Sequence, residues 1–315
     1  MRFRDKVKKP QRPVVVYEIL PPRERDGTLD SYAERISSLL SQTHIDAINI
    51  PEVRNEGTRG ERPLSNPLRA EPRAFGQLLQ DNVGVEAIVN RVVVHEEMDA
   101  QKRWLKETYY DYGIDNLVLV GGESRKAVYP GPGVNEAADF VTRELNMRRF
   151  DYFCGGITIP SRKEEAQRML EKSRHGIEFF TSQVLYESAD VKRMLRQYQD
   201  LCDLKGTAPR RILLSFAPVS SQRNIEFLKW LGVTIPPDTE ARLLESPDEM
   251  TDRSTEIAGG IMGEILQHIS EEGLRVPIGL NVEHIMSTNF QASITMLQAL
   301  AREYREFCIR TNLLG

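Results

Sequence analysis

Eight short apolar runs recur along the chain, and segments with helical periodicity lie between them. Most runs are near-continuous and rich in β-branched residues, which is typical of parallel strands covered on both faces. They span Val14–Ile19, Ile45–Ile50, Val85–Val94, Asn116–Val120, Tyr152–Ile159, Ile177–Tyr186, Arg211–Phe216 and Val276–Val282.

The intervening segments carry apolar residues three and four positions apart, which predicts helices with one apolar face. In the first of them Tyr32, Ala33, Ile36 and Leu40 share a face. The predicted helices are Leu29–Ser41, Met98–Tyr112, Asn135–Met147, Arg162–Arg174, Ala189–Leu204, Gln222–Leu231, Ser254–Glu272 and Thr288–Phe307.

Alternating strands and helices imply parallel strands joined by right-handed crossovers. Eight repeats favour closure, so we predict an α/β fold with one (β/α)8 TIM barrel over residues 14–315. Pro21-Pro22-Arg23 follows the first strand, where a Rossmann fold would carry a glycine-rich fingerprint. The sequence therefore argues against an open dinucleotide-binding sheet.

Three segments depart from this rhythm. Residues 1–13 are rich in lysine and arginine and predict a solvated basic arm, without the apolar stretch of a secretory signal. Glu52–Pro72 is polar and follows the second strand, so it is either a cover over a ligand or a surface loop. Pro236–Asp252 is acidic and contains proline, and it is also predicted to be a long excursion from the strand–helix alternation.

Composition narrows the class of protein. The 315 residues are 40% hydrophobic and 28% charged, with a net charge of −4, which gives no electrostatic case for nucleic acid. No apolar stretch approaches the ~20 residues of a membrane span. The three cysteines form no CxxC motif and suit a reducing, cytoplasmic setting. A small-molecule ligand, a protein partner and homo-oligomerisation all remain open.

Polar residues stand at the ends of the predicted strands. In a barrel these ends meet on one face, where chemistry takes place, so separation in sequence does not prevent convergence. The set comprises Glu18, Asn49, Glu52, Arg91, His95, Gly121, Gly122, Glu123, Thr158, Arg162, Ser182, Gln183, Glu187, Ser215, Asn281, Glu283 and His284.

Glu18 is the candidate catalytic residue of this set. It ends an apolar strand, and a carboxyl group partly withdrawn from water keeps its proton closer to neutral pH, as a general acid requires. The alternative is a structural ion pair with Arg91 or Arg23.

Three other groups allow two interpretations each. Gly121-Gly122-Glu123 fits either close approach to a ligand or a simple tight turn. Gln183 lies within an apolar run, where its amide could pair with a heterocycle or with the barrel itself. Glu283 and His284 could do acid–base work, but the five histidines show no metal-ligand spacing, so no metal is expected.

Four segments resemble the methylenetetrahydrofolate reductase family, and the similarity runs across most of residues 14–300. Tyr17–Pro22 resembles its Glu-x-x-Pro-Pro opening, and Gly113–Glu123 its fourth strand, which usually ends Arg-Gly-Asp. Phe180–Tyr186 is similar to its sixth strand, Thr-Gln-x-x-(Phe/Tyr). Arg211–Pro218, followed by Phe227–Pro236, resembles its seventh-strand region.

The resemblance implies reduction of 5,10-methylenetetrahydrofolate to 5-methyltetrahydrofolate, within one-carbon metabolism and methionine biosynthesis. Glu18 matches the family's general acid, Glu123 stands for its pterin-contacting aspartate, and Gln183 matches its folate-binding glutamine. We also expect Asn281 and Glu283 to contact the folate substrate.

The expected cofactor is NAD(P)H, bound with the help of Arg91, His95, Gly121, Gly122 and Arg162. FAD is in question, because Gly121 replaces the usual arginine and the segment Thr158–Arg162 replaces the usual Tyr-Pro-x-x-His loop. The chain is also similar to a flavin-independent, mycobacterial-type branch, in which hydride passes directly from the nicotinamide to the folate. Two alternatives stay open: a folate-binding or partner-binding barrel without reductase activity, and another C1-transfer enzyme.

Overall fold

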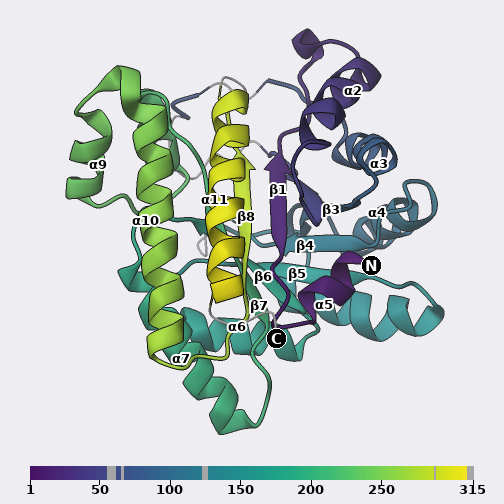
Figure 1. Cartoon of the computed structure of the whole chain (residues 1–315). Helices are drawn as coiled ribbons and strands as arrows, with labels where there is room; N and C mark the ends of the chain where they lie inside the picture. Colours follow the sequence, from purple (N-terminus) through teal and green to yellow (C-terminus); the bar gives the residue numbers. More distant parts are fainter. Residues whose placement is uncertain (55–61, 65–66, 123–126, 287–288, 311–315) are drawn as a thin grey trace.

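A computed structural model describes all residues except 55–61, 65–66, 123–126, 287–288 and 311–315. Eight parallel strands form a closed barrel in sequence order, and β8 pairs with β1 (Figure 1). The predicted fold class is therefore confirmed. The strands are β1 (Val15–Ile19), β2 (Ala47–Ile50), β3 (Glu86–Val92), β4 (Asn116–Val120), β5 (Phe153–Thr158), β6 (Phe179–Val184), β7 (Arg211–Phe216) and β8 (Ile278–His284).

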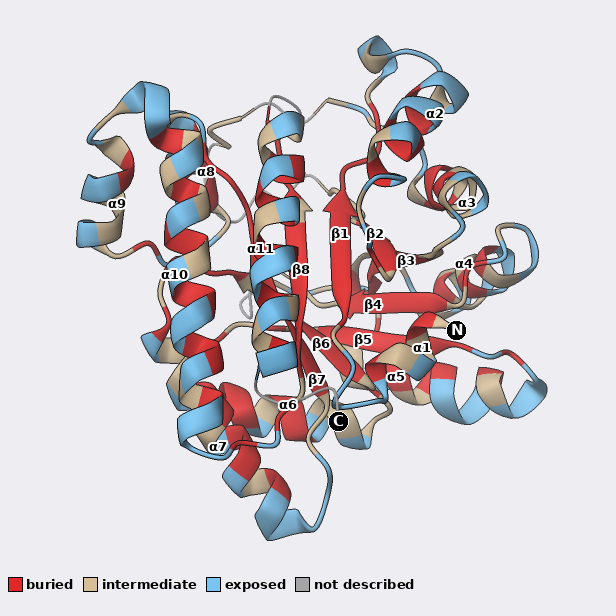
Figure 2. Ribbon diagram, viewed as in Figure 1, coloured by how far each residue is buried: buried red, intermediate tan, exposed pale blue. Residues whose placement is uncertain are grey.

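Helices surround the barrel, and their buried faces point at the strands (Figure 2). Those that follow the predicted pattern lie close to the expected bounds, apart from α5. They are α2 (Leu29–Leu40), α4 (Met98–Tyr110), α5 (Val134–Asp139), α6 (Glu165–Arg174), α7 (Ala189–Lys205), α8 (Gln222–Trp230), α10 (Met250–Glu271) and α11 (Phe290–Arg310).

The structure adds helices that the pattern did not predict. α3 (Pro72–Val83) begins with proline after Glu71, whose side chain accepts a hydrogen bond from the Ala74 amide, and it supplies the missing crossover between β2 and β3. α9 (Pro237–Leu244) lies in the acidic excursion. The predicted helix over 135–147 is divided, because π-helical turns occupy Phe140–Leu145.

Alternate residues of each strand fill the barrel interior. One buried cluster contains Val16, Ala47, Ile88, Val118 and Leu213, which come from five different strands. Glycine is required where these layers are tight. A Cβ atom at position 155 would lie 2.4 Å from the Phe179 ring, and one at position 279 would lie 2.4 Å from Leu213.

The N-terminal arm is solvated only in part, which corrects the expectation from its charge: residues 8–12 are exposed, but Phe3 and Val7 are buried. Residues Phe3–Val7 form helix α1, and both Phe3 and Val7 belong to the interior cluster. The Phe3 ring is fully buried, edge-on to Phe153 and Phe179 with centroids 6.2 and 5.5 Å away. The arm therefore closes the end of the barrel opposite the strand C-termini.

Charged groups hold this closure in place. Arg2 pairs with Glu86, Asp115 and Asp151, three carboxylates on the barrel wall. Arg211, which is 2% exposed, donates hydrogen bonds to the carbonyl oxygens of Val7 and Lys9 at 3.0 and 2.6 Å. The basic residues of the arm serve as anchors, and the buried guanidinium is satisfied by backbone acceptors.

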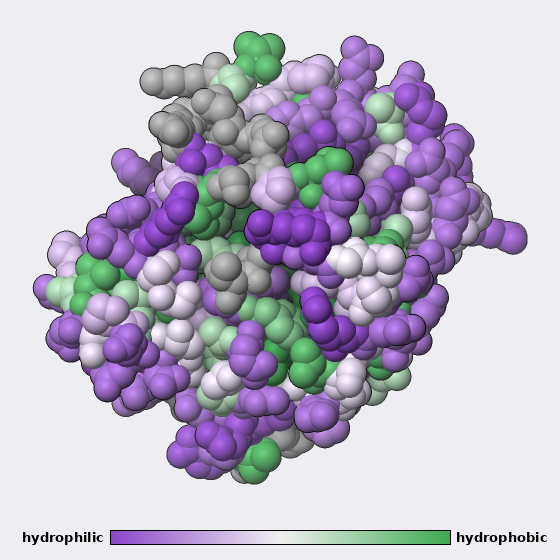
Figure 3. All heavy atoms as spheres, turned by 90° about the horizontal axis from the view of Figure 1, so that it is seen from above, coloured by the Kyte–Doolittle hydropathy of each residue, from purple (hydrophilic) through white to green (hydrophobic). Residues whose placement is uncertain are grey.

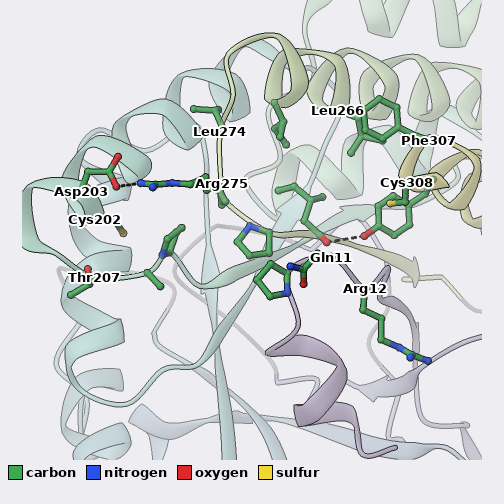
Figure 4. Close-up of a pocket in the computed structure, with 18 of the residues that line it drawn as sticks. Gln11, Arg12, Cys202, Asp203, Thr207, Leu266, Leu274, Arg275, Phe307 and Cys308 are labelled. Carbon is green, nitrogen blue, oxygen red and sulfur yellow. Dashed lines mark hydrogen bonds and ion pairs between the residues drawn. The ribbon is translucent and has the colours of Figure 1, made fainter. Parts of the chain in front are cut away.

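An apolar cavity of about 670 Å³ opens beside this closed end (Figure 4). Leu266, Leu274 and Phe307 line it, together with the arm residues Gln11 and Arg12. The cavity lies among helix C-termini, at the end of the barrel that usually serves stability. No helix among the described residues is long and apolar enough to cross a membrane.

Replacing Phe3 with alanine is expected to lower the free energy of unfolding by about 3 kcal/mol, since it removes a fully buried ring from the barrel core. Urea denaturation followed by circular dichroism measures this change. Leu68→Ala is the control, because Leu68 is 88% exposed and its loss should change little. Equal stability of the two variants would contradict a structural role for the Phe3 ring at the closed end of the barrel.

Candidate functional site

The top layer of the barrel interior is polar, whereas the layers below it are apolar. It contains Glu18 of β1, Asn49 of β2, Ser215 of β7, and Asn281 and Glu283 of β8, all one or two pleats above the apolar cluster. Figure 3 views the molecule from the side toward which β1 points, and it shows hydrophilic side chains around a hollow with hydrophobic walls. The predicted convergence of strand ends places a polar site here.

Glu18 lies in this layer and is 8% exposed. Burial raises the pKa of its carboxyl group to about 7, although hydrogen bonds from Asn49 and Asn281 act in the opposite direction. The Asn49 Nδ2 donates to Glu18 Oε2 at 2.5 Å. A carboxyl group with this pKa is a competent proton donor at neutral pH.

Glu283 is the register partner of Glu18 across the β1–β8 pair. Both side chains face the interior, so two carboxyl groups adjoin in the same layer. Burial raises the pKa of Glu283 well above its ordinary value, and the neighbouring charge of Glu18 raises it further. The electrostatic cost of two adjacent carboxylates favours retention of a proton by the pair.

Amide and hydroxyl groups link the carboxyl groups to the rest of the layer. Asn281 Nδ2 lies 3.0 Å from Ser215 Oγ and 3.3 Å from Glu283 Oε1. Thr181 Oγ1 and Ser215 Oγ are 3.2 Å apart. The amide oxygens of Asn49 and Asn281 are buried and have no partner among the described residues, so they are available to a donor in the hollow.

Asn49 and Thr181 were not among the residues singled out from the sequence as binding groups. The alternation of side chains along a strand could have identified them. Asn49 lies two residues after Ala47 and Thr181 two residues after Phe179, and both of those positions face the barrel interior. Thr158, Ser182 and His284 belong to the outward set of the same strands, as the contact of Thr158 with Met194 of α7 illustrates.

Arg91 and Arg23 do not pair with Glu18. The alternative that Glu18 forms a structural ion pair with one of them is therefore not supported. Arg91 is 2% exposed and contacts Glu52 and Glu96 at 3.0 and 2.8 Å. Arg23 pairs with Asp26 at 2.7 Å and holds the pKa of that carboxyl group at about 2. The predicted contact of Arg91 with a cofactor stays a prediction, since its guanidinium is engaged within the protein.

Gln183 projects above the polar layer. Its Nε2 donates to the Leu231 carbonyl oxygen at 3.0 Å, at the end of α8. The pairing of β6 with β7 shifts register between Thr181 and Val184, around this residue. A shift of this kind redirects a side chain at the strand end, and contact of Gln183 with folate stays a prediction.

The glycine pair follows β4. A Cβ atom at Gly122 would lie 2.4 Å from the Tyr129 ring, so the close packing of this tyrosine accounts for the glycine. The same ring lies edge-on to His95, with centroids 5.4 Å apart. Glu123 lies outside the described residues, and its contact with the substrate stays a prediction.

Gly122 and Arg162 line one cavity of about 660 Å³, which is formed by the loops after β4 and β5 together with α5 and α6. Its charged lining is mainly basic, with two acidic and four basic side chains: Glu164, Glu171, Arg162, Lys163, Arg168 and Lys172. Lys172 donates to the Ile157 carbonyl oxygen at 2.6 Å, and burial lowers the pKa of its ammonium group. Two of the predicted cofactor-binding residues thus meet at a site whose charge suits an anion.

Described parts of the excursion over 52–72 lie against the mouth. The Ala70 amide donates to the Pro22 carbonyl oxygen at 2.8 Å, in the loop after β1. The Arg62 guanidinium lies 4.9 Å from the Phe227 ring centroid on α8. The excursion therefore contacts both the loop after β1 and α8.

In the described part of the chain, no three His, Cys, Asp or Glu side chains gather as the ligands of a metal ion would. His284 is buried against the Phe290 ring, and burial lowers the pKa of its imidazole to about 4. The imidazole is therefore neutral, and both of its ring nitrogens are buried without a hydrogen-bond partner among the described residues.

Fold and site together define an α/β barrel with a buried pair of carboxyl groups at the C-terminal ends of its strands. Residues 2–301 match the family described as methylenetetrahydrofolate reductase. The chain belongs to that family, as the sequence resemblance predicted. A search of curated proteins gave no match.

A solved structure shares the fold over nearly the whole chain. An uncharacterized protein from Clostridium thermocellum that binds two copies of 5-methyl-5,6,7,8-tetrahydrofolic acid has a TM-score of 0.76 and 22% identity, with 95% of this chain and 98% of that chain covered. A 2,3-dimethylmalate lyase has a TM-score of 0.46 and 12% identity, with 93% of each chain covered. The first supports the architecture, and the second is too distant to inform the site.

The buried Glu18 carboxyl group predicts a pH-dependent stability. A carboxyl group whose pKa is higher in the folded chain stabilises the fold fully below its ordinary pKa of 4.5, and this contribution is lost as the pH rises through about 7. Glu18→Gln is therefore expected to gain up to about 3 kcal/mol over the wild type between pH 5 and pH 8.

Urea denaturation at the two pH values measures this gain. Glu306→Gln, an exposed change on α11, is the control. A difference between Glu18→Gln and the wild type that is the same at both pH values would show that the Glu18 proton is not retained on folding.

Proposed function

We propose that the protein is a methylenetetrahydrofolate reductase-like oxidoreductase that converts 5,10-methylenetetrahydrofolate to 5-methyltetrahydrofolate. The observation that carries the proposal is the protonatable Glu18 in the polar layer of a barrel of this family. A general acid at this place is what opening of the five-membered folate ring requires. The methyltetrahydrofolate bound by the Clostridium thermocellum protein supports the substrate class.

The chemistry balances with one proton and one hydride. Glu18 donates its proton to N10 of the substrate, the bond from N10 to the methylene carbon breaks, and an N5 iminium forms. Hydride from a reduced nicotinamide then adds to the methylene carbon and gives the N5-methyl group. The carboxylate left on Glu18 recovers a proton before the next turnover. Exclusion of water by the walls of the hollow protects the iminium.

Substrate contacts are assigned to the polar residues around Glu18. Asn281 and Glu283 adjoin it in the same layer, and the unpartnered amide oxygen of Asn281 suits the N–H donors of a pterin. Gln183, above this layer, and Glu123 complete the proposed set. These assignments derive from the family resemblance and from the position of the strand ends.

NAD(P)H is the proposed hydride source. The basic cavity that contains Gly122 and Arg162 fits a nucleotide phosphate, because its excess of positive charge would meet that group. Gly121, His95 and Arg91 are also proposed to help bind NAD(P)H. A flavin, if the protein binds one, would relay the hydride between the nicotinamide and the folate, and the altered family motifs favour direct transfer.

Replacing Glu18 with glutamine is expected to abolish NAD(P)H oxidation that depends on methylenetetrahydrofolate, since the amide cannot donate the ring-opening proton. Folate binding should stay measurable by isothermal titration calorimetry. The assay is run anaerobically with NADH or NADPH, with and without FAD. Turnover near the wild-type rate would refute the assignment of the acid.

The same assay separates the alternatives. A colourless wild-type protein that oxidises NADH only when the folate is present supports direct transfer, whereas flavin absorbance supports the flavin route. Folate binding without turnover in the wild type would favour a binding protein that has lost the reaction.

Arg162→Ala is expected to raise the KM for the nucleotide about tenfold, because one charge-assisted contact to phosphate contributes on the order of 1.5 kcal/mol. The Kd for 5-methyltetrahydrofolate should stay unchanged. Arg103→Ala, an exposed change on α4, is the matched control. An unaltered nucleotide KM would remove Arg162 from the cofactor site.

A further inference from the structure

The β1–β8 pairing brings a second carboxyl group to the proposed acid. Glu18 and Glu283 are partners in register, and the neighbouring pairs Tyr17 with Val282 and Ile19 with His284 fix that register on both sides. Side chains opposite each other on adjacent strands leave the same face of a sheet. The two residues therefore stay neighbours unless a whole strand shifts its register.

Amide groups flank the two carboxyl groups. Asn49, from β2, donates to Glu18, whereas Asn281, from β8 itself, is 3.3 Å from Glu283 Oε1 and also acts on Glu18. Ser215 of β7 is hydrogen-bonded to the Asn281 amide on the side away from β1. Each carboxyl group thus has a neutral donor beside it and the other carboxyl group as its neighbour across the strand pair.

The two groups differ in access to water. Both carboxyl groups are deeply buried, but Glu283 as a whole residue is the more exposed of the two, since Glu18 is 8% exposed and Glu283 is of intermediate exposure. A proton from solvent therefore meets Glu283 more readily than Glu18. An acid that is shielded from water while the substrate is bound needs such an intermediary to recover its proton.

We infer that Glu283 is a catalytic partner of Glu18 that shares one proton with it and returns a proton to it after ring opening. The inference deepens the proposed function and rests on it. In the step, the O–H bond of Glu283 breaks and an O–H bond forms on Glu18, directly or across one water. Glu283 then takes a proton from solvent, so each turnover consumes one proton and no oxidant or reductant beyond the hydride donor.

Apart from Glu18, the groups around Glu283 named below are neutral, so the protonation of the pair depends mainly on the two carboxyl groups themselves. On β1 the group that acts on Glu283 is Glu18, and on β8 and β7 the flanking groups Asn281 and Ser215 are neutral. The Tyr186 hydroxyl group, after β6, also senses Glu283, but burial keeps it protonated, since it raises its pKa. Outside the interior, His284 is a neutral imidazole on the opposite face of β8.

The test is the pH profile of kcat/KM in wild type, Glu283→Gln and Glu283→Asp. In the wild type the pair retains one proton to a higher pH than either group would alone, because the second ionisation creates adjacent like charges. Glu283→Gln is expected to lower the pH at which activity falls by about one unit or more. Glu283→Asp, which keeps a carboxyl group, should restore the limb toward the wild type.

A structural role would give a different result. If Glu283 only packs the mouth, Glu283→Gln lowers kcat by one factor at every pH and leaves the profile in place, and this outcome overturns the inference. Exposed Glu306→Gln is the control and should reproduce the wild-type profile.

A second measurement is independent of turnover. In protein labelled with 13C at the glutamate carboxyl carbons, the signals of Glu18 and Glu283, assigned with the Gln variants, should both respond to two separate protonation steps in the wild type. In each single Gln variant the remaining signal should show one step. Single, independent steps in the wild type overturn proton sharing even if the Gln variants fail to fold, since Asp variants can supply the assignments. Two steps without turnover would instead leave the pair standing and refute the reductase proposal.

Discussion

Closure of the barrel between the first and last strands is the constraint on which the site depends. The β1–β8 register sets Glu18 beside Glu283 although the two residues stand near opposite ends of the chain. Because that register is held by backbone pairing along five residue pairs, the two residues are neighbours in every folded molecule. The raised pKa of Glu18 then follows from burial, and that of Glu283 from burial and from the charge of Glu18.

The two ends of the barrel have different roles: one stabilises the fold and the other carries the polar site. At the lower end, α1 inserts Phe3 beneath the strands, and Arg211 ties the arm to the barrel through backbone carbonyl groups. At the upper end, polar side chains replace apolar ones, and amide oxygens are left without partners among the described residues. A rigid, closed base allows the mouth to carry unsatisfied groups, which cost stability but suit a ligand.

The sequence was sufficient for the strands, because their β-branched runs are unambiguous and bounded by polar segments. It was insufficient for α3, whose start is signalled only by Glu71 and Pro72 at the end of a long polar stretch, and for α1, where basic residues obscured the i,i+4 pair of Phe3 and Val7. The sequence did identify Glu18 as the candidate acid, because it ends an apolar strand. Glu283 was also a candidate, but its place beside Glu18 was not predicted, because strand register across the closing seam has no local signature. The engagement of Arg91 with Glu52 depends on a loop contact of the same long-range kind.

The central claim is that the mouth of the barrel is where folate meets the protonated Glu18. A crystal structure of the protein with 5-methyltetrahydrofolate tests it most directly. The account predicts the pteridine in the polar layer, with a ring nitrogen within hydrogen-bond distance of the Glu18 carboxyl group and Glu283 beside it. Folate bound only in the apolar cavity at the closed end, with Glu18 out of contact, would contradict it.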